Sequence, residues 1–278
     1  MIFLVDNGSV RPEAYKNLCT IAAQLSGMLG KKIHPAPLLH ADKIPAKELG
    51  GTAARTIEDR IKEAYDSGQR KFEILPLFFG PSGALVEYFP RRLNILSKNR
   101  QNFAVRIMNP LFKDEKDGGD LLTDILEDRV MELANQLRLE SFTVLLVDHG
   151  SPKKEVTEVR NILATRLGER LNALGIHVLP ASMERRSGDE YAFNEPLLEF
   201  ILNREVYANK NVVIAQLFLS PGRHAGPNGD IAGICAKAEC DNVGLKTYRT
   251  DLIGNHPKLI DLLSRRWNER ESLPWRTF

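Results

Sequence analysis

The sequence repeats itself at a nearly constant offset, and this repeat constrains the fold more than any other feature. Residues 4–9, LVDNGS, match residues 146–151, LVDHGS, with a shift of 142. Residues 77–81, LFFGP, match residues 217–221, LFLSP, with a shift of 140. Each copy has the ~100–150 residues of a typical domain. The sequence therefore predicts two similar units, residues 1–139 and 140–278, packed together because no Gly/Ser-rich linker separates them.

Short β-rich apolar runs alternate with longer segments of helical period in both halves, a pattern typical of βαβ units. The expected strands are residues 3–6, 32–39, 72–79 and 103–108, then 143–148, 177–183, 212–219 and 245–250. The expected helices are residues 12–29, 53–67, 84–98 and 120–137, then 154–174, 195–203, 229–238 and 257–269. The predicted fold class is α/β: two tandem flavodoxin-like units, each a parallel sheet flanked by helices.

Composition excludes several classes of function. Lys plus Arg total 38 against 36 Asp plus Glu, and the net charge of +2 gives no field that would attract nucleic acid. The first residues lack the basic flank and apolar length of a signal peptide, and no apolar run is long enough for a membrane span. Three cysteines without a CxxC pair favour a reducing compartment. We expect a cytoplasmic monomer or weak homo-oligomer.

Three polar side chains of the second half follow successive expected strands. His149 follows the first, Glu184 the second, and His224 lies a few residues past the third. Ligands of open parallel sheets bind at the carboxyl ends of strands, where the strand order reverses. If the order is 2-1-3-4, strands one and three are neighbours and the two imidazoles face one crevice.

The turns around the histidines contain further candidates for ligand binding. Gly150 and Ser151 suit a tight turn that meets a polar ligand, although Ser151 can equally cap the next helix. Gly222 and Arg223 precede His224, and the guanidinium suits a carboxylate, although an incidental surface arginine is the alternative.

The first half has replaced all three candidates. Asn7 stands opposite His149, and Ala84 stands opposite His224. Weaker matches between the anchors, such as Pro37 with Pro180, place Ala41 opposite Glu184. Loss of all three together is expected if a duplicated unit needed only one metal site.

These segments resemble the sirohydrochlorin cobaltochelatase and ferrochelatase family, whose fold the class II chelatases share. The resemblance rests on VDHGS at 147–151, FLSPGRH at 218–224 and Asp230-Ile231. Met183-Glu184 and LIGNHP at 252–257 extend it from Ser141 to about Asn268. The first half resembles the same unit without its histidines, so the chain looks like a duplicated single-chain member.

The resemblance implies a chelatase, a lyase of cobalamin or siroheme biosynthesis. It would insert a divalent metal into a carboxylate-rich tetrapyrrole bound in the cleft between the halves, with His149, His224 and Glu184 handling the metal. Two imidazoles and a carboxylate suit cobalt, nickel or iron(II). A histidine, with a reference pKa near ~6.5, can also accept a pyrrole proton, and the division of ligand and base roles is open. The metal is a substrate, and no organic cofactor is expected.

Two departures from the family pattern bear on substrate identity. The segment 225–229 is about two residues longer than the usual spacing, and the histidines stand in the second half whereas long members carry theirs in the first. An alternative is a protein that binds a metal or tetrapyrrole for delivery or sensing without inserting anything. A hydrolase using His149 and Ser151 is disfavoured because no G-x-S-x-G motif is present.

The remaining candidates favour structural interpretations. His256 precedes Pro257 at an expected helix start, His177 opens a strand, and His34 and His40 lie in the half without the motif. Cys235 and Cys240 suit ordinary helix packing better than metal binding. The flanking cations Lys153, Arg185 and Arg186 are as readily solvated as bound to substrate carboxylates.

Overall fold

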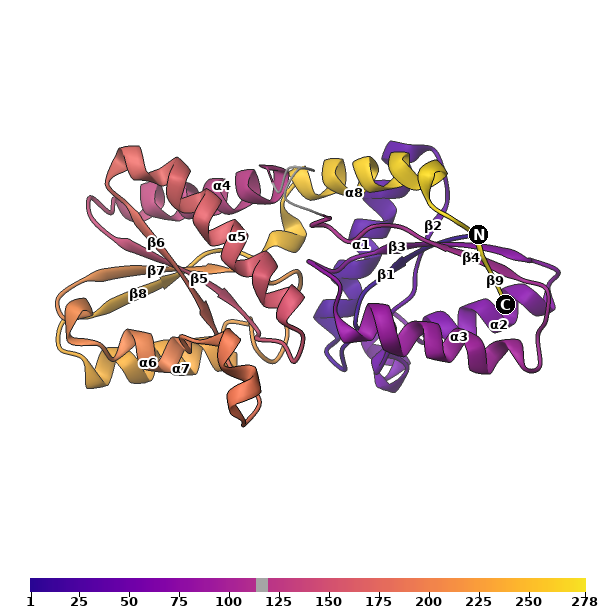
Figure 1. Ribbon diagram of the computed structural model, residues 1–278, viewed down its shortest axis with the longest axis horizontal. Helices are drawn as coiled ribbons and strands as arrows, with labels where there is room; N and C mark the ends of the chain where they lie inside the picture. The colour runs from indigo at the N-terminus through magenta and orange to yellow at the C-terminus, as the bar shows by residue number, and fades with distance from the viewer. Residues whose placement is uncertain (114–119) are drawn as a thin grey trace. The chain divides into compact units, whose positions relative to one another are not determined.

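The computed structural model describes residues 1–113 and 120–278 and contains two compact units (Figure 1). The first unit joins Met1–Lys113 to Pro257–Phe278. The second is Asp114–His256, of which the described residues begin at Asp120. Both units are sheets covered by helices, and the predicted α/β class with tandem units is confirmed.

The first unit has the strand order β2-β1-β3-β4-β9. Its parallel strands are β1 (Ile2–Val5), β2 (Ile33–Pro35), β3 (Lys71–Pro76) and β4 (Ala104–Ile107). A short edge strand, β9 (Arg276–Thr277), runs antiparallel to β4. The helices are α1 (Pro12–Leu29), α2 (Ile57–Asp66), α3 (Phe89–Ser97) and α8 (Lys258–Asn268). The predicted order 2-1-3-4 is therefore present, with one strand added at the edge.

The second unit repeats this order as β6-β5-β7-β8, all parallel. Its strands are β5 (Thr143–Asp148), β6 (His177–Ser182), β7 (Asn211–Gln216) and β8 (Lys246–Arg249). Its helices are α4 (Asp120–Leu137), α5 (Lys154–Leu171), α6 (Leu198–Leu202) and α7 (Asp230–Asp241). Figure 1 shows α4 and α5 on one face of the sheet and α6 and α7 on the other. Burial on both faces explains why Val144 to Val147 form an uninterrupted apolar run with no exposed surface.

The backbone confirms the offsets that define the repeat. The Leu77 N–H donates to Val5 O at 2.7 Å, and the Leu217 N–H donates to Val147 O at 2.9 Å. The two bonds are equivalent in the two units, so Val5 corresponds to Val147 at a shift of 142 and Leu77 corresponds to Leu217 at a shift of 140. The helices α1 and α5 also share the shift of 142 at both ends.

The predicted alignment of Ala41 with Glu184 is wrong. The Leu38 N–H donates to Asp6 O at 2.9 Å, and the Met183 N–H donates to Asp148 O at 2.8 Å, so this segment has a shift of 145. The residue opposite Glu184 is therefore Leu39. Weak matches such as Pro37 with Pro180 set the false offset, whereas strand pairing determines the true register. Leucine offers no metal ligand either, so the first unit still lacks a counterpart of Glu184.

The compact units exchange the last helix of each repeat. In the order of the chain, α4 follows β4 of the first repeat, yet it packs on α5 and β7. Likewise α8 follows β8 of the second repeat and packs on α1 and β3. The division of the sequence repeat between residues 139 and 140 stays a prediction, and each compact unit contains one helix from the other half of the chain.

Asp6, which follows β1, gives the first unit a pH-dependent stability. Its Oδ1 accepts a hydrogen bond from the Gly8 N–H at 3.0 Å, while burial raises the pKa of its carboxyl from 3.8 to about 7. Since the folded state binds more protons than the unfolded state between pH ~4 and ~7, the free energy of unfolding falls as the pH rises through this window.

We expect Asp6→Asn to be more stable than the wild type at pH 8 by roughly 2–4 kcal/mol, because the amide carries no charge and its oxygen can still accept the turn hydrogen bond. The advantage should vanish at pH 4. Urea unfolding at the two pH values measures both, and a variant less stable than the wild type at pH 8 would contradict the prediction.

Candidate metal centre

The fold brings the two predicted histidines of the second unit together. His149 follows β5 and His224 lies in the loop between β7 and α7; their ring centroids are 4.6 Å apart with the planes at 72°. Imidazoles that ligate one ion at ~2.0–2.1 Å and at angles near 90–110° have centroids roughly 4.5–5 Å apart. The observed separation is thus compatible with two ligands of one ion.

The turn after β5 requires glycine. Gly150 has φ +91°, and a Cβ there would lie 1.9 Å from the carbonyl oxygen of Glu184. The Gly150 N–H donates to Asp148 Oδ1 at 3.1 Å, and the Glu184 N–H donates to His149 O at 3.1 Å. The ends of β5 and β6 therefore approach closely enough to place Glu184 beside His149. These strand ends are where the sequence predicted a site.

Hydrogen bonding orients the His149 ring. Its Nδ1 lies 2.9 Å from Gly150 O, and since a carbonyl oxygen only accepts, Nδ1 carries the proton in this contact. In the neutral ring Nε2 then has a free lone pair, and it lies 3.4 Å from Glu184 Oε1. Two acceptors facing each other attract a proton or a metal ion between them. Nitrogen and oxygen ligands ~2.0–2.2 Å from one tetrahedral ion are themselves roughly 3.4 Å apart.

Asp230 holds the second ring. The Asp230 Oδ2 lies 2.7 Å from His224 Nδ1, so the carboxylate favours the proton on Nδ1 and leaves Nε2 as the nitrogen that could bind a metal. Asp230 is the first residue of α7, where the helix dipole also favours an acid. Arg223, whose side chain is 77% exposed, places its Nε 3.4 Å from the same Oδ2.

The loop of His224 is longer than its counterpart in the first unit. The buried residues Phe89, Leu93 and Leu96 of α3 recur at a shift of 142 in α7, whereas the strand before them has a shift of 140. The second unit therefore has two extra residues between strand and helix. Arg249 supports this loop by donating to Gly226 O at 3.0 Å and Pro227 O at 3.3 Å.

The remaining predicted site residues have local roles or are exposed. The Ser151 Oγ accepts from the Lys153 N–H at 3.0 Å, which orders the entry to α5. A Cβ on Gly222 would meet nothing within 4 Å, so the close approaches in this loop involve Gly226 and Gly229 instead. Among Gly150, Ser151, Gly222 and Arg223, the arginine is the residue classed as exposed to solvent.

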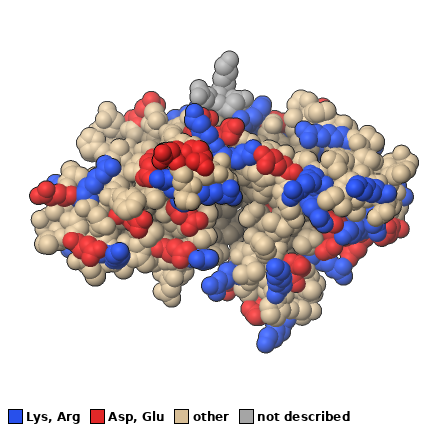
Figure 2. All heavy atoms as spheres, turned by 60° about the horizontal axis from the view of Figure 1, so that its bottom comes forward, with Lys and Arg blue, Asp and Glu red and all other residues tan. Residues whose placement is uncertain are grey.

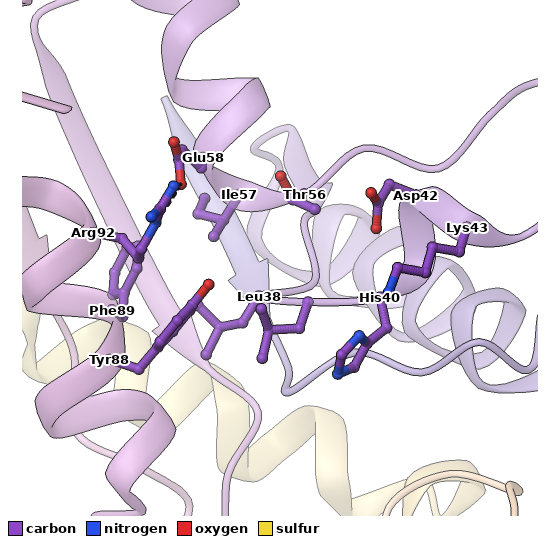
Figure 3. Close-up of a pocket in the computed structure, with 11 residues that line it drawn as sticks. Leu38, His40, Asp42, Lys43, Thr56, Ile57, Glu58, Tyr88, Phe89 and Arg92 are labelled. Atoms are coloured by element: carbon purple, nitrogen blue, oxygen red, sulfur yellow. Dashed lines mark hydrogen bonds and ion pairs between the residues drawn. The ribbon is translucent and has the colours of Figure 1, made fainter. Parts of the chain in front are cut away.

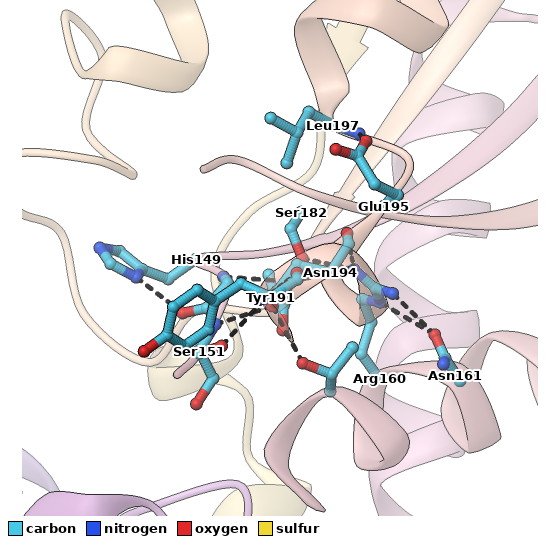
Figure 4. A network of polar contacts seen from close by, with 12 residues as sticks. His149, Ser151, Arg160, Asn161, Ser182, Tyr191, Asn194, Glu195 and Leu197 are labelled. Carbon is cyan, nitrogen blue, oxygen red and sulfur yellow. Dashed lines mark hydrogen bonds and ion pairs between the residues drawn. The ribbon is translucent and has the colours of Figure 1, made fainter. Parts of the chain in front are cut away.

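Sequence reasoning did not assign the polar groups beneath the His149 turn (Figure 4). Burial raises the pKa of Asp148, an effect that the Arg160 charge and the Ser182 hydrogen bond partly oppose. Asn194 and Arg160 complete this cluster, and both are buried. An arginine at an apolar position of a helix was the available signal, since Arg160 interrupts the buried side of α5. Asp230 was part of the family resemblance but had no role assigned to it.

The other histidines and cysteines lie outside this crevice or are structural. His256 is buried, with its Nε2 3.3 Å from Asp128 Oδ2, as expected for a packing role. His177 begins β6, at the opposite end of the strand from Glu184. Cys235 is buried and burial raises its pKa to about 11, while Cys240 is exposed.

The first unit contains a cavity of about 250 Å³ at the end of β2 (Figure 3). His40 lies at its edge, and the Arg92–Glu58 ion pair closes the far side. The cavity is lined by Leu38, Leu39, His40, Asp42, Lys43, Thr56, Ile57, Glu58, Tyr88, Phe89 and Arg92. Its acidic and basic lining residues are equal in number, and His40 is the single histidine among the lining residues.

Within residues 1–113 and 120–278, no group of three or more His, Cys, Asp or Glu side chains is arranged so that it could hold a metal ion. His149, Glu184, His224 and Asp230 are linked as neighbouring pairs. No described helix combines the length and hydropathy that a membrane crossing requires. On the face shown in Figure 2, basic and acidic side chains are interspersed, in line with the small net charge.

Comparison with known proteins finds one family model that matches part of the chain and several solved structures with a similar fold. Residues 143–270 match the family model CbiX. The match covers slightly less than half of the chain and lies in the second half of the sequence. A search of curated proteins gives no match.

Three solved structures share the fold along nearly the whole chain. SirB from Bacillus subtilis with Fe³⁺ is 15% identical, with a TM-score of 0.67, covering 97% of this chain and 94% of its own. The sirohydrochlorin chelatase SirB from Bacillus subtilis subspecies spizizenii, in complex with cobalt, is 16% identical, with a TM-score of 0.67 and coverage of 98% and 94%. CbiX, described as the terminal enzyme for siroheme biosynthesis in denitrifying bacteria, is 14% identical, with a TM-score of 0.61 and coverage of 96% and 97%.

Proposed function

We propose that this protein inserts a divalent metal into a sirohydrochlorin-like tetrapyrrole, with His149, His224 and Glu184 receiving the metal. The match of residues 143–270 to the CbiX family model supports the chelatase class. Cobalt and iron are the first metals to test, since similar structures contain them, and nickel suits the same ligand types. A cytoplasmic location and a monomeric or weakly associated state remain predictions.

The proposal rests on two acceptor atoms, one from His149 and one from Glu184, that lie beside the imidazole of His224. His149 Nε2 faces Glu184 Oε1 at 3.4 Å, and the His224 ring lies 4.6 Å away between centroids. Each histidine has its Nδ1 engaged by an oxygen, which leaves both Nε2 atoms for a cation. A metal substrate must also leave, and the partial exposure of His149, Glu184 and His224 favours transfer to the macrocycle.

Metal insertion also releases two pyrrole protons, which need acceptors. A neutral imidazole can accept a proton near neutral pH, and Glu184 Oε1 can accept the hydrogen bond of the imidazolium that forms on His149. The Asp230 carboxylate can stabilise an imidazolium on His224 in the same way. Arg223, exposed beside this site, is suited to a carboxylate arm of the substrate. Gly150, Ser151 and Gly222 would shape the rim that contacts the macrocycle.

The test is a single-turnover absorbance measurement with sirohydrochlorin and either cobalt or iron(II). We expect the wild-type protein to accelerate the spectral change of metalation over the protein-free rate. A protein that shifts the spectrum of the bound tetrapyrrole without accelerating metalation would instead be a delivery or sensing protein. That result would overturn the proposed insertion activity.

Removing the Asp230 carboxylate should weaken metal binding. We expect Asp230→Ala to lower the affinity for cobalt about 10–100-fold, because His224 loses the acceptor that orients its ring and fixes its tautomer. Asp230→Asn, whose amide oxygen can still accept from Nδ1, should retain part of the affinity. Titration with cobalt, followed by absorbance, measures both, and unchanged affinity in Asp230→Ala would exclude this role.

A further inference from the structure

A buried polar network lies directly beneath the His149 turn (Figure 4). Asn194 and Ser182 have no exposed surface, Arg160 and Thr157 are 1% exposed, and Asp148 is 7% exposed. Five polar side chains in one core region are costly unless each is paired, and only a specific arrangement satisfies them all.

Asn194 holds Ser151, the second residue after His149, by both backbone groups. Its Oδ1 accepts from the Ser151 N–H at 2.9 Å, and its Nδ2 donates to Ser151 O at 2.9 Å. The same Oδ1 accepts from Thr157 Oγ1 at 3.0 Å, which ties the turn to α5. Asn194 thereby fixes the backbone on the C-terminal side of Gly150.

Arg160 fixes the N-terminal side of the turn, at Asp148, and also donates to the backbone of Asn194. Its Nη1 donates to Asn194 O at 3.0 Å, contacts Ser182 Oγ, and lies 3.6 Å from Asp148 Oδ1. The Ser182 Oγ donates to that same Oδ1 at 2.6 Å, and this oxygen accepts the Gly150 N–H. The network therefore joins both ends of the segment that carries His149.

The first unit shows that the fold itself does not need this network. At the shift of 142 that relates α5 to α1, Arg160 corresponds to Leu18, which is fully buried. At the shift of 145 for the neighbouring strand, Ser182 corresponds to Pro37. The turn is nevertheless the same, with Gly8 bonded to Asp6 as Gly150 is to Asp148.

Apolar replacement of a buried ion pair is often neutral or stabilising, so stability gives little reason to keep Arg160 in the core. The unit that lacks the histidines also lacks Arg160 and Ser182, whereas the unit that has them has the whole network. This coincidence associates the network with the site.

We propose that Asn194 and Arg160 are positioning residues that hold His149 in the geometry for receiving the metal. This inference rests on the proposed function of the same site. Neither side chain reaches the crevice, because both are buried, so their effect passes through the backbone of residues 148–151. Loss of either residue should change where the imidazole stands relative to Glu184 and His224, and so the geometry of a bound metal.

The test uses Asn194→Ala and Arg160→Leu, the second of which installs the residue found in the first unit. The control is Asn242→Ala, which removes another buried asparagine of the same unit. Asn242 donates to Leu202 O at 3.0 Å and Arg204 O at 3.1 Å, between the end of α6 and the start of β7, at the opposite end of the strands from His149. Each protein is titrated with cobalt(II) while its visible absorption is recorded, and metalation is measured under conditions where circular dichroism shows it folded.

We expect both network variants to shift the cobalt absorption bands and to raise the KM for cobalt about 10–100-fold, with the KM for the tetrapyrrole nearly unchanged. The control should keep the wild-type spectrum and both KM values. If Arg160→Leu does not fold, Asn194→Ala decides the question alone.

Two results would overturn the inference: a wild-type cobalt spectrum in Asn194→Ala, or the same spectral shift in Asn242→Ala, which would indicate general loosening. Failure of the proposed function is distinct, because the wild-type protein would then show no accelerated metalation.

Discussion

Replacing either His149 or His224 with alanine is expected to lower the rate of enzyme-accelerated metal insertion at least about a hundredfold. Each substitution removes one of the two imidazoles that would ligate the metal or accept a pyrrole proton. Both side chains are partly exposed, at 46% and 27%, so truncation leaves little cavity and the stability should fall by only ~1 kcal/mol. Single-turnover metalation and urea unfolding measure the two effects separately.

Two matched histidines serve as controls. His177→Ala alters the same unit at the other end of β6, and His40→Ala alters the first unit, which lacks the histidine pair. Both should retain nearly wild-type rates. Rates measured at limiting and saturating metal also separate the roles, since a lost ligand can be partly rescued by more metal and a lost proton acceptor cannot. Wild-type rates in both His149→Ala and His224→Ala would remove the proposed mechanism and favour the delivery or sensing alternative.

Gly150→Ala is expected to disrupt the site more than its size suggests. The new Cβ would lie 1.9 Å from Glu184 O, on a backbone at φ +91°, so the ends of β5 and β6 must separate. Because His149 and Glu184 stand on those ends, their 3.4 Å contact is lost. We expect metalation to fall about a hundredfold or more, and stability to fall by roughly 1–3 kcal/mol from the backbone strain, with the steric contact adding to this.

The repeat supplies a control with the same clash. Gly8→Ala would place its Cβ 1.8 Å from Leu39 O at φ +83°, in the unit without the histidines. Gly175→Ala, at φ +69° with open space around it, isolates the backbone strain alone. Gly8→Ala should destabilise the protein much as Gly150→Ala does, yet keep the metalation rate of the folded fraction. Equal rate losses in Gly8→Ala and Gly150→Ala would show that the effect is not local to the His149 turn.

The periodicity of the sequence was sufficient to predict most elements. Helices α1 and α4 have the predicted bounds, and all eight predicted strands are present, because their apolar residues lie at spacings that only one regular structure can bury. The segment 84–98 was predicted as one helix, and the structure divides it into a π-helical turn, Ala84–Tyr88, and α3. The two-residue strand β9 was not predicted, since so short a segment has no periodicity of its own.

Register and helix exchange needed the tertiary structure. Nothing in the composition of α4 or α8 says which sheet it covers, because an amphipathic helix can pack on either of two similar sheets. The hydrogen bonds between strands likewise show that Leu39 and Glu184 occupy equivalent positions in the two repeats, which isolated residue matches did not reproduce.

For the metal centre, the sequence by itself determined which side chains follow the strand ends, and that one repeat kept them and the other did not. Parallel strands in the order 2-1-3-4 bring those ends together, so the approach of His149 to His224 could be expected. Only the tertiary structure decided that Glu184 Oε1 faces Nε2 of His149, that Asp230 orients His224, and that Asn194 and Arg160 lie beneath the turn. The physical reason is that hydrogen bonds depend on angles and distances of tenths of an ångström between segments far apart in the chain, and periodicity contains no information about them.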